Sequence, residues 1–177
     1  MKIVQRSLLI LVGCLLTLPG AVSRAADNDT VITLRARLTG LEEVPPIFTP
    51  GSGTFQGTLS PDRNTLTFRL AWRDLRSPAQ VAHIHFGQRR VNGGVMLFLC
   101  GGGNQPACPA ETTAQIKGTA TAANVTGPAG QGIDPGDFAA AVEALLTGQT
   151  YVNVHSTLFP NGEVRGQVRV HEQQPED

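Results

Sequence analysis

The stretch Ala82-His83-Ile84-His85-Phe86-Gly87 places two histidines two residues apart in an otherwise apolar run. Side chains of a β-strand alternate between its two faces, so His83 and His85 share one face and the apolar residues share the other. A second run, Tyr151-Val152-Asn153-Val154-His155, alternates in the same way. If the apolar faces point inward, His83, His85 and His155 all point outward and can converge on the protein surface.

Other segments show the same two-residue period. Residues 31–39 and 65–73 alternate apolar and polar side chains, and the apolar face of 65–73 includes Trp72, the only tryptophan. Residues 94–100 are apolar on both faces, which is typical of a strand covered on both sides. The pattern predicts an all-β fold, an antiparallel Greek-key β-sandwich or barrel of about seven or eight strands.

One segment has helical spacing instead. Apolar residues recur at helical intervals before Gly148, which suits a helix end. Asp134 is a suitable N-cap and Pro135 suits the first helical position, with Asp137 in the first turn. We therefore expect a single short helix at about 135–147.

Residues 149–158 and 163–170 predict a β-hairpin. The joining residues Pro160-Asn161-Gly162 suit a type I turn with a bulge at the glycine. A three-residue loop would place His155 opposite Gln167 and would make Arg165 a diagonal neighbour of His155.

The N-terminus resembles a secretory signal peptide. Basic residues precede an apolar run that is too short to span a membrane, and small residues lead to a cleavage site after Ala25. The alternative is a lipid anchor at Cys14, since Leu11-Val12-Gly13-Cys14 fits a lipobox. We expect a signal peptide at 1–25, a linker at 26–31, one domain at 32–170 and a flexible tail at 171–177. The mature protein would be secreted or periplasmic.

Charge and cysteine content narrow the function classes. The chain has fourteen basic and fourteen acidic residues, and cleavage would leave eleven basic against fourteen. This balance gives no net basic field for nucleic acid.

Cys100 and Cys108 are the two cysteines of the mature chain, and export favours a disulfide between them. The alternative, a thiolate metal site, lacks a second cysteine pair. We expect a monomer with no transmembrane segment.

Four motifs occur in order along the chain: LTG with EVPP (residues 38–40 and 43–46), AHIHFG (82–87), YVNVHS (151–156) and GEVRGQ (162–167). Together they resemble the CHRD (chordin-type) domain family over residues 32–170. The resemblance implies an exported β-rich domain, found alone in microbial proteins and repeated in the animal antagonist chordin. It also implies a fold that has been likened to copper/zinc superoxide dismutase.

The dismutase likeness suggests a role for the histidines. In that enzyme an H-x-H strand supplies two copper ligands, and His83 and His85 match this pattern, with His155 as a third ligand. The chain departs from the dismutase in two ways, because it has no histidine and aspartate cluster for a bridging zinc and no fourth strong ligand. A dismutase-like redox enzyme is therefore the most distant hypothesis.

Neutral imidazoles suit copper and zinc, so His83, His85 and His155 form a candidate metal site. In the alternative, these histidines are structural and hydrogen-bond to neighbouring side chains. Supporting roles fall to Glu43, Tyr151, Asn153, Glu163 and Arg165. Glu163 and Arg165 would form an ion pair that either braces the site or lies at a solvated edge. Glu43 would be a partner or ligand of the site, or an exposed loop charge, which we favour.

No catalytic constellation is found. Ser156 follows His155, and neighbouring residues of a strand point to opposite faces, so they cannot form a nucleophile and base pair. We therefore predict a non-enzymatic binding module with a three-histidine surface site for copper or zinc. The alternative is a metal-free adhesion domain that recognises a protein or a glycan through its loops.

Overall fold

The structure is a computed structural model that describes residues 31–173. The predicted signal peptide, the alternative anchor Cys14, most of the predicted linker and the last four residues lie outside the described residues. No helix of the described part is long and apolar enough to cross a membrane.

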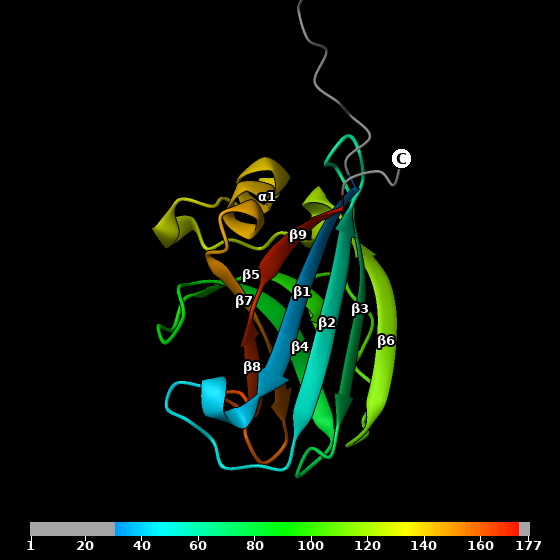
Figure 1. Cartoon of the computed structure of the whole chain (residues 1–177), viewed down its shortest axis with the longest axis vertical. Coiled ribbons are helices and arrows are strands. Elements are labelled where there is room, and N and C mark those ends of the chain that lie inside the picture. Colours follow the sequence, from blue (N-terminus) through cyan, green and yellow to red (C-terminus); the bar gives the residue numbers. More distant parts are fainter. Residues whose placement is uncertain (1–30, 174–177) are drawn as a thin grey trace, which may run out of the picture.

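Antiparallel strands form nearly the whole fold (Figure 1). Their order across the sheet is β5-β4-β7-β8-β1-β2-β3-β6, and β9 pairs with β1 beyond the end of β8. The strands are β1 (Val31–Thr39), β2 (Ser52–Leu59), β3 (Leu66–Arg73), β4 (Ala79–Phe86), β5 (Gly94–Cys100), β6 (Ala114–Ala120), β7 (Thr150–Ser156), β8 (Val164–Gln167) and β9 (Arg169–Gln173). The prediction of an antiparallel β-barrel with one helix is confirmed.

The sheet curls into a nearly closed barrel around a single apolar core. Edge strands β5 and β6 approach each other, and Leu97 of β5 forms an isolated bridge with Val125. The alternating apolar residues of β1, β2 and β3 point inward, and Trp72 is buried as expected. The Trp72 indole N–H donates a hydrogen bond to the carbonyl of Glu111 at 3.0 Å, so its polar end is satisfied inside the core.

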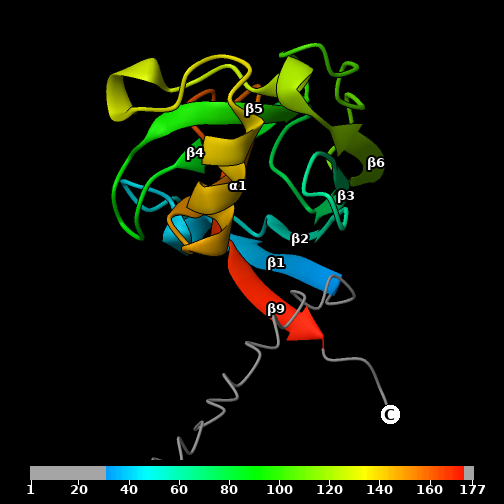
Figure 2. The same ribbon diagram turned by 90° about the horizontal axis from the view of Figure 1, so that it is seen from above.

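The helix α1 (Phe138–Leu146) covers one end of the barrel, as the view from above shows (Figure 2). It begins three residues later than predicted, because Asp137 rather than Asp134 is the N-cap and accepts a hydrogen bond from the Ala140 N–H at 2.9 Å. Gly136 precedes it with φ at +84°, a left-handed conformation that cannot belong to the helix. Three short 3-10 helices complete the fold, at Gly40–Glu42 (η1), Ala122–Asn124 (η2) and Ala129–Gln131 (η3).

The β7–β8 register differs from the prediction by four residues. Tyr151 pairs with Gln167 and Asn153 pairs with Arg165. The predicted three-residue loop is wrong, because β7 ends at Ser156 and β8 begins only at Val164. The connection is closed by local turns instead, including a hydrogen bond from the Glu163 N–H to the Val154 carbonyl. Arg165 consequently lies directly across from Asn153 and close to the histidines.

Two further boundaries differ from the sequence-based expectation. Val31 already belongs to β1, and β9 continues to Gln173, so the first three residues assigned to a tail pair with β1.

The predicted disulfide between Cys100 and Cys108 is confirmed. It closes the loop after β5, and Gly102 and Gly103 of this loop lie against the Phe98 ring.

Candidate metal centre

The three histidines lie on the face of β4 and β7 that points away from the core. In the β4–β7 ladder His83 pairs with Asn153, His85 pairs with Tyr151, and Val81 pairs with His155. Antiparallel pairing keeps partners on one face, so the two strands bring all three imidazoles together. The β4–β5 register shifts next to His83 and His85, an irregularity of the kind that often re-aims side chains near functional sites.

This polar face is covered by loops and does not form a surface. His83, His85 and His155 are only 6%, 9% and 8% exposed, so the predicted surface site is wrong. The cover includes the β4–β5 loop (87–93) and the segment that follows η1. The two segments are tied together by a hydrogen bond from Asn92 to the Val44 carbonyl. Sequence alternation predicted the outward face but carries no information about long-range loops that close over it.

Each of the three clustered histidines has one buried ring nitrogen that forms no hydrogen bond. These nitrogens are Nδ1 of His83, Nε2 of His85 and Nε2 of His155. One potential ligand atom from each histidine lies within 4.8 Å of the others. A buried polar atom without a partner is costly, so three of them in one histidine cluster indicate a site for a group that accepts their lone pairs.

Backbone carbonyls orient two of the rings. His85 Nδ1 lies 2.8 Å from the Gly93 carbonyl oxygen, and His155 Nδ1 lies 2.9 Å from the Pro160 carbonyl oxygen. A carbonyl can only accept, so each Nδ1 carries the proton and each Nε2 keeps a free lone pair. Metal-bound histidines are commonly held in this way through their second nitrogen.

The electrostatics of the site keep the imidazoles neutral. Burial, reinforced by His155 and His85, lowers the pKa of His83 to about 2. Burial also lowers the pKa of His85 to about 4, to which Arg165 contributes by repulsion, and it lowers the pKa of His155. At neutral pH all three imidazoles are therefore neutral, which is the form that binds a metal.

Arg165 holds the cover against the site. It is 2% exposed, and its guanidinium donates hydrogen bonds to the carbonyls of Gln88 and Val91 in the β4–β5 loop, at 3.0 and 2.8 Å. The same group lies 3.4 Å from the centre of the Tyr151 ring, and this ring stacks on His85 at 4.6 Å between centroids. One side chain thus links a loop, an aromatic ring and a histidine.

Glu43 belongs to this region, although we favoured an exposed loop charge from the sequence. It is 6% exposed, and its Oε1 has no hydrogen-bond partner. Burial raises the pKa of Glu43 to about 7, against the opposing pull of Arg165 and Asn153. Gly162 lies beside it at φ +119°, and a Cβ there would stand 2.6 Å from the Glu43 carboxylate.

The predicted ion pair between Glu163 and Arg165 is wrong, as is a solvated edge position. Both side chains are buried, and no ion pair joins them within residues 31–173. Glu163 lies before the first residue of β8, so strand alternation does not align it with Arg165. Its carboxylate instead accepts hydrogen bonds from the Thr49 hydroxyl at 2.6 Å, the Arg76 backbone N–H at 2.8 Å and the Ser156 hydroxyl at 2.5 Å.

Some contributors to the site could not be identified from the sequence. The carbonyls of Gly93 and Pro160 belong to residues whose side chains give no signal for this role. Gly93 has one physical signature, because a Cβ there would lie 1.8 Å from the Phe86 carbonyl oxygen, so only glycine fits. Phe98 of β5 packs its ring against His83 in an edge-on arrangement at 5.2 Å. Its place in an apolar strand predicted no more than core packing.

The fold and the site define a class of protein: a small antiparallel β-barrel with a histidine cluster enclosed beneath its loops. A family model described as the CHRD domain matches residues 34–168. The chain therefore belongs to the CHRD domain family. No curated protein and no solved structure matched the chain.

Proposed function

We propose that this CHRD domain is an exported, non-enzymatic binding module that holds one copper or zinc ion on His83, His85 and His155. The observation that carries the proposal is a cluster of three buried, neutral histidines, each with one ring nitrogen that forms no hydrogen bond, and with one potential ligand atom from each lying within 4.8 Å of the others. A purely structural set of histidines would be expected to satisfy both nitrogens of each ring, because unpaired buried polar atoms destabilise a fold.

The donor geometry is compatible with a single ion. Metal–imidazole bonds of roughly 2.0–2.1 Å place tetrahedral ligand atoms about 3.4 Å apart. The candidate atoms lie within 4.8 Å of one another, so an inward shift of about an ångström closes the set. Asn153 and Glu43 each have an unpartnered buried oxygen in the same region and are candidates to support a further ligand position.

Ligand chemistry predicts the order of affinity. Imidazole donors suit both copper and zinc, and divalent copper binds nitrogen sites more tightly than zinc in general. We therefore expect Cu²⁺ to bind more tightly than Zn²⁺. An exported module of this kind would bind or carry the ion.

Isothermal titration of the mature chain from Ala26, without an affinity tag, tests the proposal with Cu²⁺ and Zn²⁺. The test variant is His83→Ala/His85→Ala, and the matched control is His171→Ala, whose histidine is exposed on β9. Electron paramagnetic resonance of the Cu²⁺ form reports nitrogen ligation. His85→Gln, which better preserves side-chain volume, serves if the double variant does not fold.

We expect one ion per chain, bound by the wild type and by His171→Ala but lost in the site variants. Saturation at a hundred times the Kd stabilises a fold by about 2.7 kcal/mol, so the melting temperature should rise by several degrees in the wild type only. Equal binding by all variants would refute the metal centre. The histidines would then be structural, which favours the metal-free interaction domain.

A further inference from the structure

The outer face of β9, β1, β2, β3 and β6 carries a row of five aligned side chains, four of which are cationic. The register aligns Arg169 with Arg35, Arg35 with Gln56, Gln56 with Arg69, and Arg69 with Lys117. All five side chains are exposed. Five strands at about 4.8 Å spacing make this row roughly 19 Å long. The row is called the cationic row below.

Four of the five strands that carry the cationic row have no acidic residue, and the fifth, β9, has Glu172, which pairs with Ile32. The sequences of β1, β2, β3 and β6 contain no aspartate or glutamate. Within residues 31–173, the four cations of the row form no ion pair. The chain as a whole has equal numbers of basic and acidic residues, so this face concentrates positive charge that the net charge conceals.

Fold stability does not account for this arrangement. Like charges directly opposite each other in a sheet are destabilising, and the row contains two such pairs, Arg35 with Arg169 and Arg69 with Lys117. A lysine on the edge strand β6 serves to discourage strand pairing between molecules. That reason does not extend to Arg35 and Arg69, which lie on inner strands of the sheet.

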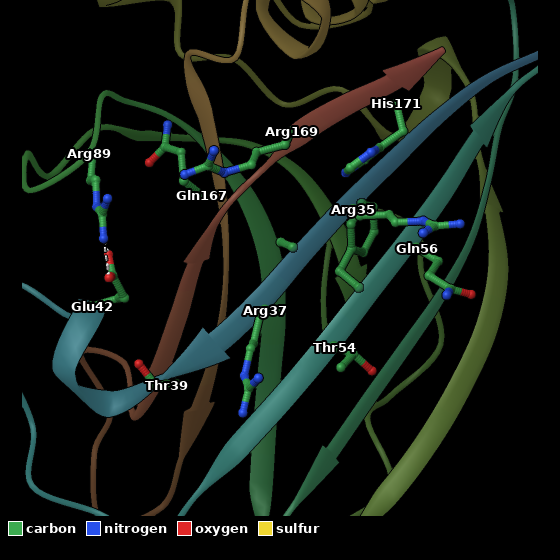
Figure 3. A pocket seen from close by; sticks show the side chains of 12 residues that line it. Arg35, Arg37, Thr39, Glu42, Thr54, Gln56, Arg89, Gln167, Arg169 and His171 are labelled. Atoms are coloured by element: carbon green, nitrogen blue, oxygen red, sulfur yellow. Dashed lines mark hydrogen bonds and ion pairs between the residues drawn. The ribbon is translucent and has the colours of Figure 1, made fainter. Parts of the chain in front are cut away.

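The face is hollowed where the row crosses β9 and β1 (Figure 3). A hollow of about 500 Å³ is lined by Arg35, Arg37 and Arg169, with Arg89 and Glu42 paired at its rim. The guanidinium groups are planar forks that bind carboxylate, sulfate or phosphate groups through two hydrogen bonds.

Hydroxyl side chains occupy many of the other positions of this face, which also holds Arg37, Arg73 and His171. The register aligns four threonines in a row parallel to the cationic row: Thr33, Thr58, Thr67 and Thr119. Protein interfaces depend on aromatic and large apolar anchors. Among the exposed large apolar residues of the described chain, only Val31 belongs to these strands.

From these observations we infer that this face binds an acidic polysaccharide, a linear chain of carboxylated or sulfated sugars lying along the cationic row. Repeated anionic groups match the spaced cations, and sugar hydroxyls match the threonine and glutamine side chains. The proposal is independent of the metal centre, whose histidines lie on β4 and β7.

The binding of alginate, dextran sulfate and neutral dextran to the mature chain tests this inference. The test variant is Arg35→Gln/Arg69→Gln, and the matched control Arg63→Gln/Arg76→Gln removes the same charge from exposed loop positions. Arg169→Glu is a further variant that reverses one charge of the row. Thermal unfolding of each variant checks that it is folded.

We expect alginate, dextran sulfate or both to bind at 50 mM NaCl, and the stronger of the two identifies carboxylate or sulfate as the preferred anion. Binding should weaken roughly tenfold at 200 mM NaCl because counterions are released. The test variant should lose at least tenfold in affinity and the control less than twofold, while neutral dextran should not bind. An equal loss of polysaccharide affinity in the test and control variants would overturn the inference. So would a wild type that binds neither acidic polysaccharide, or one that binds poly-glutamate or duplex DNA as tightly as the polysaccharide.

The metal-site variant separates the two proposals. His83→Ala/His85→Ala should bind the acidic polysaccharide with wild-type affinity. A parallel loss in this folded variant would overturn the independence of the two sites. A failed metal titration would leave the polysaccharide result unaffected.

Discussion

Replacing Glu163 with alanine should be among the most destabilising single changes outside the apolar core. The side chain is fully buried, and its carboxylate accepts three hydrogen bonds from three different segments. Hydrogen bonds to a charged group contribute about 1.5–3 kcal/mol each, although neighbouring bonds are not additive. Alanine also leaves the buried Ser156 hydroxyl without this acceptor. We expect a loss of about 3–5 kcal/mol in the free energy of unfolding.

Glu163→Gln separates hydrogen bonding from mere loss of volume. Its amide oxygen can keep the Thr49 and Arg76 donors, and its amide nitrogen can replace Oε2 if the Ser156 hydroxyl reverses to accept. The expected cost is only about 1–2 kcal/mol, because charge-assisted bonds become neutral ones. Glu111→Ala removes an exposed glutamate and should change stability by less than about 0.5 kcal/mol.

Urea unfolding followed by Trp72 fluorescence measures all three variants on one scale. The buried indole reports loss of the core, and the slope of the transition checks that the unfolded states are comparable. A cost below 1 kcal/mol for Glu163→Ala would refute the reasoning. So would equal costs for Glu163→Ala and Glu163→Gln, since the second variant preserves the hydrogen-bond pattern.

Other perturbations test the site and its surroundings. In a competition titration, metal affinity should fall less than about tenfold between pH 7.5 and 5.5, because protons compete weakly for histidines whose pKa values are lowered. A site of three histidines with ordinary pKa values would lose roughly a thousandfold in metal affinity over the same range. Glu43→Gln should gain about 3 kcal/mol in stability relative to wild type on going from pH 4 to pH 8.5. The reason is that the raised pKa of Glu43, about 7, makes the ionised carboxylate unfavourable in the folded state. A stability difference between variant and wild type that does not vary with pH would contradict this. Gly93→Ala should unfold at lower temperature and bind metal poorly, because its Cβ would collide with the Phe86 carbonyl; unchanged metal affinity would be evidence against the role of the Gly93 carbonyl. Replacing Cys100 and Cys108 with serine should cost about 2.5 kcal/mol, a value set by the short loop that the disulfide closes and checked by thermal unfolding.

Strand alternation was a reliable guide to the barrel because each strand buries one face. Leu66, Phe68, Leu70 and Trp72 were assigned inward from their spacing, and all four are buried. The same reasoning placed His83 and His85 on a shared outward face with His155. These inferences needed only local periodicity, which survives folding wherever the core is on one side.

The periodicity of the sequence could not predict which distant loops close over the histidines. Glu43 comes just before a proline-rich segment that looks exposed, yet the fold buries it beside Gly162, more than a hundred residues later in the chain. The β7–β8 register failed because the turn signal at 160–162 was real but lay within a longer connection. A partner that is a backbone carbonyl, as for His155 and Pro160, leaves no trace in side-chain patterns.

The arginine that fastens the β4–β5 loop has a consequence for the timing of ion exchange. In the proposed metal centre, the hydrogen bonds of Arg165 to Gln88 and Val91 hold the β4–β5 loop over the enclosed imidazoles, and we expect them to open before an ion enters. The rate of uptake should therefore rise with ion concentration only up to a ceiling, which is the opening rate of the loop. Release would pass through the same gate, so the domain would exchange its ion slowly even where its equilibrium affinity is modest. If the proposed metal centre is loaded, the residence time of the ion would be set by loop opening as well as by the strength of the metal–imidazole bonds.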